Sequence, residues 1–179
     1  MIINIEYRGC SINPLNRIRL QFEICQAIRQ RPEKINLLFA TTGGQINEAF
    51  LFYDFIKELD YPINIFNIGE IRSAGTVMFL AFDNRFFLQK AKFLFHAVRL
   101  NKDVVITTEK QEQNKKFNEK MLSIFDDRIN LPPDYISTMK KTLDDIEISD
   151  PKEINKFSIA TFSDEKFIPT ISIPCADNK

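Results

Sequence analysis

The first hundred residues alternate between two kinds of hydrophobic pattern. Short apolar runs rich in β-branched and aromatic side chains predict strands. These runs lie at residues 2–7, 35–40, 62–67, 85–88 and 92–96. In the segments between the first three runs, and again directly after Ser73, apolar residues have the spacing of helices that are buried on one face or all round. Strand and helix therefore follow one another repeatedly, which predicts an α/β domain with right-handed crossovers.

Two of the predicted helices, at residues 14–30 and 45–59, have a broad apolar face. For the first helix, we expect the core-facing row to be Leu15, Ile18, Phe22, Cys25 and Ile28. For the second helix, the apolar face consists of Ile46, Ala49, Phe50, Phe52, Tyr53 and Ile56. The polar residues of the first helix gather on the opposite side, as expected for a helix that covers a sheet.

The pattern changes after residue 96. Residues 103–107 predict one more strand, and residues 108–129 predict a largely polar helix with a thin apolar stripe. The stripe consists of Phe117, Met121 and Ile124. Two interpretations stay open for about 108–130: a solvated helix, or a protruding oligomerisation arm that packs against another subunit through this stripe.

The last part of the chain has weaker signals. A helix is predicted from residue 131 to about 141, because proline is tolerated in the first helical turn. An irregular tail is expected at about 162–179. No repeat or low-complexity linker divides the chain, so residues 1–179 are predicted to form a single domain.

Charge and composition narrow the function classes. The 24 basic and 24 acidic residues cancel, so no net field attracts nucleic acid or an anionic membrane. No apolar run approaches the length of a membrane span, and the N-terminus lacks the pattern of a signal peptide. The three cysteines have no C-x-x-C spacing and only one histidine to share a metal with, so we expect free or buried thiols, no metal site and a cytoplasmic location.

Ser73 and His96 are the first candidates for chemistry. Ser73 falls at a predicted strand-to-helix turn, where the unpaired N–H groups of a helix start could hold an oxyanion beside the hydroxyl. His96 ends a predicted strand and is the only histidine in the chain. Each has a structural alternative, because serine is a common helix cap and a lone histidine is more often a hydrogen-bonded structural residue.

A second candidate feature is the pair Gly43-Gly44, which follows Thr41-Thr42 at the end of a buried strand. Glycine allows close backbone approach at such a turn, and the N–H groups at the following helix start are unpaired. Two glycines there could form half of an oxyanion hole. The structural alternative is a simple tight turn.

Taken together, these motifs resemble the proteolytic subunit of the Clp protease family. The resemblance rests on a strand ending in Gly-Gly, then Gly69-x-x-x-Ser73-x-Gly75 before an apolar helix, then Arg-Phe and a strand that ends in His96. It extends over about residues 35–96 and more weakly to about 160. It implies a single-domain ClpP/crotonase-like fold, a spiral of stacked strand-helix units.

The resemblance also implies residue roles. Ser73 would be the nucleophile and His96 the general base, with the backbone N–H groups of Gly44 and Ala74 binding the oxyanion. Gly43 and Gly69 would support the turns. The third triad member would be Asp145, which precedes Ile148-Ser149, with Asp144 as the competitor.

The resemblance further implies the partners. The substrate would be a peptide or unfolded protein that lies extended beside a strand edge, in a homo-oligomer and without a cofactor. The chain begins almost at its first strand, so we do not expect dependence on an ATPase unfoldase. Arg72 stands where a small residue is more common, and it is expected to reach solvent or to pair with Glu70 or with substrate.

Two alternatives to a serine endopeptidase stay open. A crotonase-like enzyme would use the Gly-Gly turn to stabilise the enolate of an acyl-CoA thioester and would need no serine nucleophile. A non-catalytic ring subunit would keep the fold with a misaligned triad.

Overall fold

The computed structural model describes residues 1–99, 107–141 and 144–176. Most of the strand predicted at 103–107 lies outside these residues. The elements in chain order are β1 (Ile2–Arg8), α1 (Pro14–Arg29), β2 (Lys34–Thr41), α2 (Ile46–Glu58), β3 (Ile63–Arg72), α3 (Ala74–Leu80), β4 (Asn84–Phe87), β5 (Lys92–Phe95), α4 (Thr108–Arg128), α5 (Pro133–Lys141), β6 (Ile146–Ile148), α6 (Pro151–Lys156), β7 (Thr161–Phe162) and β8 (Ile171–Ser172).

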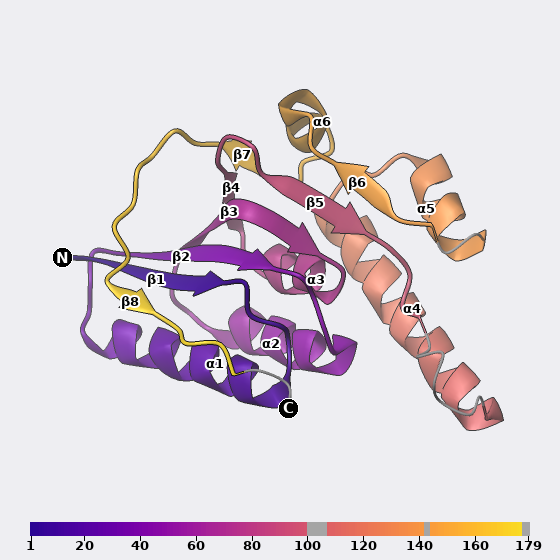
Figure 1. The fold of residues 1–179 in the computed structure, drawn as a ribbon, viewed down its shortest axis with the longest axis horizontal. Helices are drawn as coiled ribbons and strands as arrows, with labels where there is room; N and C mark the ends of the chain where they lie inside the picture. Colours follow the sequence, from indigo (N-terminus) through magenta and orange to yellow (C-terminus); the bar gives the residue numbers. More distant parts are fainter. Residues whose placement is uncertain (100–106, 142–143, 177–179) are drawn as a thin grey trace.

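One sheet organises the domain, in the strand order β6-β5-β3-β2-β1-β8, with α1 and α2 along one side of it (Figure 1). Strands β1, β2 and β3 are parallel, as expected when a helix connects successive strands. Strand β3 changes partner along its length: Asn64–Asn67 pair with β4, and Glu70–Arg72 pair with β5. The end of β3, which leads to Ser73, therefore lies against β5, which leads to His96. The alternating α/β architecture predicted from the sequence is confirmed.

Side-chain amides on one face of the sheet reinforce the register. Asn4, Asn36 and Asn64 stand opposite one another in β1, β2 and β3. The Nδ2 group of Asn36 donates to Asn4 Oδ1 at 2.9 Å, and that of Asn64 donates to Asn36 Oδ1 at 3.1 Å. Since a parallel register shifted by one residue would turn an amide to the other face, this ladder favours the observed pairing.

The predicted core face of α1 is wrong. Leu15, Ile18 and Phe22 are 49%, 53% and 56% exposed, whereas the neighbouring row is buried. That buried row consists of Asn16, Leu20, Ile24 and Ala27. Both rows have helical spacing, and the row that contains Asn16 was not predicted to be buried because Asn16 is polar. In the structure Asn16 is fully buried because Ser11 O, Ala176 O and Ala176 N satisfy its amide.

Helix α4 extends away from the sheet (Figure 1). The stripe noted in the sequence packs against the helix's own chain: Met121 and Ile124 are buried, and the Phe117 ring lies 6.0 Å from that of Phe50 in α2. The preceding turns are polar and carry the pair Glu112–Lys116 four residues apart. This stripe is therefore packed within the chain, and the role of α4 as an oligomerisation arm stays a prediction.

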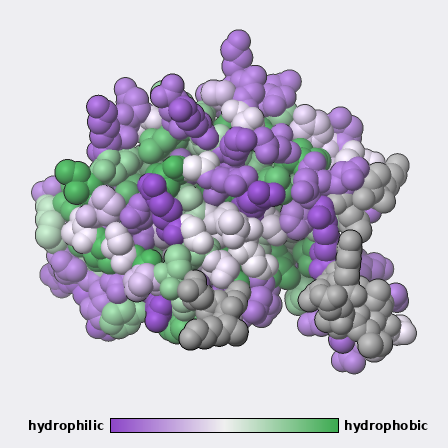
Figure 2. Space-filling model, viewed as in Figure 1, coloured by the Kyte–Doolittle hydropathy of each residue, from purple (hydrophilic) through white to green (hydrophobic). Residues whose placement is uncertain are grey.

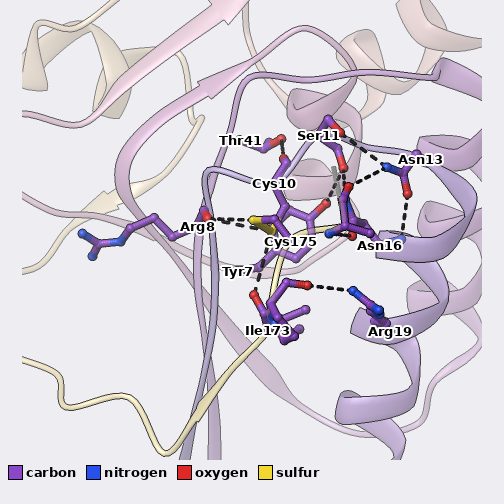
Figure 3. Close-up of a disulfide and its surroundings, with 12 residues drawn as sticks. Tyr7, Arg8, Cys10, Ser11, Asn13, Asn16, Arg19, Thr41, Ile173 and Cys175 are labelled. Carbon is purple, nitrogen blue, oxygen red and sulfur yellow. Dashed lines mark hydrogen bonds between the residues drawn. A yellow bond between two sulfur atoms is a disulfide. The ribbon is translucent and has the colours of Figure 1, made fainter. Parts of the chain in front are cut away.

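The C-terminal tail corrects two expectations. It is not wholly irregular, because β7 pairs with β4 and β8 pairs with β1. The tail also brings Cys175 to Cys10, and the two form a disulfide across a sequence separation of 165, with Cα atoms 5.0 Å apart (Figure 3). Free thiols were expected at all three cysteines, but only Cys25 has one. The pairing depends on where β8 docks, which no local spacing encodes.

Figure 2 shows charged and polar side chains over the visible face, with hydrophobic residues reaching the surface between them. No helix in the described ranges is long and apolar enough to span a bilayer.

Candidate active site

Ser73 has an unusual backbone. Its φ is 55° and its ψ is −128°, in a region that residues other than glycine rarely adopt and that costs about 1–3 kcal/mol. Its N–H donates to Leu94 O of β5 at 2.9 Å, which anchors the turn. Ser73 stands at the N-cap position of α3, but its side chain makes no capping hydrogen bond. The hydroxyl therefore does not cap α3, as the structural alternative for Ser73 requires.

Gly43 lies directly against the serine. A Cβ atom on Gly43 would lie 2.7 Å from Ser73 Cβ and 3.3 Å from Ser73 Oγ, and Gly43 has a φ of 94°. Both the close approach and the positive φ require glycine here. The turn between β2 and α2 thus contacts the side chain of the candidate nucleophile, as the combined motifs led us to expect.

The backbone N–H groups of this turn can be accounted for one by one. Gly43 N donates to Thr41 Oγ1 at 3.1 Å, and Gln45 N donates to Ile12 O at 2.9 Å. Gly44 N, between them, has no hydrogen-bond partner among the residues that the structure describes. The same holds, within those residues, for Ala74 N at the start of α3. Two unpaired donors therefore flank the contact between Gly43 and Ser73.

His96 follows the last residue of β5. The register pairs Arg72 with Leu94, so Ser73 and His96 lie just beyond the paired ends of neighbouring parallel strands. The Nδ1 atom of His96 is 2.6 Å from Ala97 O. Because a carbonyl only accepts, this bond requires a proton on Nδ1, and in the neutral imidazole Nε2 is then the acceptor. Among the described contacts, no hydrogen bond joins Ser73 Oγ to His96.

Asp145 is placed near His96 by the sheet but is bound elsewhere. Strand β6 runs antiparallel to β5 and pairs Ile146 with Phe95, so one further step of this register sets Asp145 opposite His96. Its carboxylate forms an ion pair with Arg99. The side chains of this pair are 41% and 45% exposed. The structure thus places Asp145 at the strand end opposite His96, and its carboxylate pairs with Arg99 and not with the imidazole.

Two further expected residues have clear positions. The Nη1 atom of Arg72 pairs with Glu70 Oε1 at 3.3 Å, which is one of the outcomes expected for this arginine. Gly69 N donates to Asn67 Oδ1 at 3.0 Å, at the point where β3 changes partner from β4 to β5. Gly69 therefore lies within strand β3, and not in a turn as had been expected of it.

Two residues of the site were not predicted. Thr41 was noted only as part of the Gly-Gly motif, although its buried hydroxyl binds the turn. Arg99 was not considered at all, and its distance from Asp145 in the sequence gives no signal for their contact.

The family comparison agrees with this architecture. Residues 18–154 match the model of the Clp protease family, described as "Clp protease". The match covers well over half of the chain, and the chain therefore belongs to the Clp protease family. Membership in this family favours the peptidase hypothesis over the acyl-CoA alternative.

Individual relatives are more distant. The ATP-dependent Clp protease proteolytic subunit of Paracoccus denitrificans is 30% identical over 66 residues, which are 36% of this chain and 33% of that protein. The matched segment thus spans about a third of that relative. A mutant of ClpP1 from Listeria monocytogenes superposes with a TM-score of 0.73 over 92% of both chains at 18% identity. This second likeness shows the ClpP fold, and with it the fold predicted from the sequence.

Proposed function

We propose that this protein is a serine endopeptidase that hydrolyses peptide bonds through an acyl-enzyme on Ser73. The observation that carries the proposal is the strained Ser73 turn, whose uncapped hydroxyl faces Gly43 while Gly44 N beside it has no partner among the described residues. Strain of this kind clusters at functional sites, where the surrounding structure maintains it. A serine held only for helix capping would need neither feature.

In the proposed reaction, His96 Nε2 takes the proton of Ser73 Oγ as the oxygen attacks the peptide carbonyl carbon. The N–H groups of Gly44 and Ala74 stabilise the oxyanion that forms. The tetrahedral intermediate collapses, and the imidazolium gives its proton to the leaving amine. Water, activated by the same imidazole, then hydrolyses the ester and restores the serine. These reaction steps require the imidazole tautomer with the proton on Nδ1, which is the tautomer that the bond to Ala97 O favours.

The triad needs two side-chain rearrangements. Asp145 exchanges Arg99 for His96 Nδ1, and the imidazole turns toward Ser73. The register already sets Asp145 opposite His96, so this exchange requires side-chain rotation rather than a new strand pairing. Ion pairs between exposed groups contribute at most about 1 kcal/mol, so the Arg99 contact is a small barrier to it.

The substrate is proposed to be an extended peptide or unfolded protein, bound by backbone pairing at a strand edge. Assembly as a homo-oligomer is proposed as well. Leu15, Ile18 and Phe22 form an apolar row on the exposed side of α1, which an assembled interface would remove from water. Replacing Ile18 with Asp should shift the protein toward monomer in sedimentation or light scattering, whereas Gln26→Asp, at a polar and partly exposed position of the same helix, should not.

The test of the peptidase is labelling with a fluorophosphonate probe, followed by peptide hydrolysis. Wild type should be labelled and Ser73→Ala should not. Ser158→Ala is a matched control, because Ser158 also has a positive φ of 56° but hydrogen-bonds to Asn130 away from the site. Equal labelling of wild type and Ser73→Ala would refute the assignment.

A second candidate is a non-catalytic ring subunit of the same fold. The ion pair between Arg99 and Asp145 favours it, because this pair occupies the carboxylate that the triad needs. Oligomers that remain unlabelled by the probe, with or without peptide, would support this candidate over the peptidase.

A further inference from the structure

Thr41 is the last residue of β2 and is only 2% exposed. Its hydroxyl makes two hydrogen bonds: Oγ1 donates to Cys10 O at 2.7 Å and accepts from Gly43 N at 3.1 Å (Figure 3 shows the first). A carbonyl oxygen only accepts, so the hydroxyl proton must point to Cys10. The oxygen lone pairs are then directed away from Cys10, and one of them receives the N–H of Gly43.

These two bonds fix the orientation of the Gly-Gly turn. Gly43 N points into the protein toward Thr41, and Gly43 O accepts from Ile12 N at 2.8 Å. With Gln45 N bound to Ile12 O, the peptide groups around Gly44 N are held on both sides. Gly44 N is the donor of this turn that remains available for an oxyanion. The acceptor of the Thr41 bond is itself anchored, because Cys10 is joined to Cys175.

The methyl group of Thr41 contacts the helix that follows Ser73. A Cβ atom on Gly75 would lie 2.4 Å from Thr41 Cγ2, so α3 approaches β2 closely just after Ser73. Thr41 therefore touches the glycine turn through its hydroxyl and the serine helix through its methyl. Serine would keep the first contact, and valine the second.

We propose that Thr41 is a positioning residue that sets the direction of the Gly43–Gly44 backbone and thereby presents Gly44 N to the oxyanion. The proposal rests on the proposed peptidase function for its catalytic consequence. Its structural part, the hold of one hydroxyl on the turn, does not depend on that function.

The test compares Thr41→Val, which keeps the shape and loses the hydroxyl, with Thr41→Ser, which keeps the hydroxyl and loses the methyl. Thr42→Val, at the exposed neighbour, is the control for substitution in the same segment. Two readouts are measured on the full chain: hydrogen–deuterium exchange of the peptide that contains Gly43, and kcat and KM for a fluorogenic peptide at a temperature where every variant is folded by circular dichroism.

For Thr41→Val we expect exchange of the turn to rise at least about tenfold, because Gly43 N loses its acceptor. We expect kcat to fall about 10- to 100-fold with KM little changed, since oxyanion donors act on the transition state. Thr41→Ser should stay within about threefold of wild type in both readouts, because its hydroxyl is retained.

Equal losses of kcat in the two Thr41 variants, or unchanged exchange in Thr41→Val, would overturn the proposal. If the wild type itself hydrolyses no peptide and takes no probe, the peptidase function fails. The exchange readout still decides in that case whether Thr41 holds the turn.

Discussion

The two halves of the candidate site are built differently. The half that contains Ser73 and the glycine turn lies at the ends of the central strands β3 and β2. The N–H groups of Gly43, Gln45 and Ser73 are hydrogen-bonded there, and those of Gly44 and Ala74 have no partner among the described residues. The half that contains His96 and Asp145 lies at the edge of the sheet, where an exposed ion pair with Arg99 engages the carboxylate. The proposed nucleophile and oxyanion donors are thus held by backbone hydrogen bonds and close packing, whereas the proposed third triad residue, Asp145, is held by an ion pair that water weakens.

The largest effect is expected for Gly43→Ala. A Cβ atom there would lie 2.7 Å from Ser73 Cβ and 2.9 Å from Arg72 O, so the turn and the serine must separate. We expect about 3 kcal/mol of lost stability and at least a hundredfold loss of probe labelling. Chemical denaturation and labelling rates measure these two effects.

Gly9→Ala is the control for Gly43→Ala. Gly9 has a φ of 73° but nothing within 4 Å of its added Cβ, so it isolates backbone strain. It should cost about 1–2 kcal/mol and leave labelling unchanged. If Gly43→Ala behaves like Gly9→Ala, the buried half of the site does not depend on close packing.

The second expected effect concerns the edge half. Asp145→Asn should lower kcat about 10²- to 10⁴-fold, because the amide favours the wrong imidazole tautomer, while stability changes by less than about 1 kcal/mol. Asp144→Asn, measured in the same peptide assay, should remain near wild type. The reverse result would assign the third triad position to Asp144.

The third prediction concerns stability alone. Reduction of the Cys10–Cys175 disulfide, or Cys175→Ser, should lower the free energy of unfolding by about 2–5 kcal/mol, because the bond closes most of the chain into one loop. Cys25→Ser should have little effect, since Cys25 is a free thiol. Urea denaturation with and without a thiol reductant measures the difference. An identical midpoint in both conditions would mean that the tail docks without the bond.

The smallest effect is expected for Arg99→Gln. Release of Asp145 should raise kcat, but by no more than about fivefold, because an exposed ion pair contributes at most about 1 kcal/mol. Higher salt should raise the wild-type kcat in the same direction and leave Arg99→Gln unchanged. A lower kcat in Arg99→Gln would show that Arg99 supports the triad, and the contrast between the two halves would then need revision.

Much of the fold was predictable because burial leaves a local pattern. The apolar runs that became β1, β2 and β3 are buried strands, and the helices between them appear where the helical spacing indicated. The prediction failed where two patterns competed, as in α1, whose exposed row is more apolar than the row that contains Asn16. The amide of Asn16 is buried at little cost only because Ser11 and Ala176 meet it, and Ala176 reaches it through the docking of the tail.

The sequence by itself determined the strand-helix alternation and the placement of Ser73, Gly43 and His96 at the ends of strands, because these follow from local hydrophobic spacing and from residue types that suit turns. The tertiary structure alone decided the contact of Gly43 with Ser73, the hold of Thr41 on the glycine turn, the pairing of Asp145 with Arg99 and the joining of Cys10 to Cys175. Apart from the short-range bond between Thr41 and Gly43 N, these contacts join distant segments through strand register or the docking of the tail, which short-range sequence patterns do not specify.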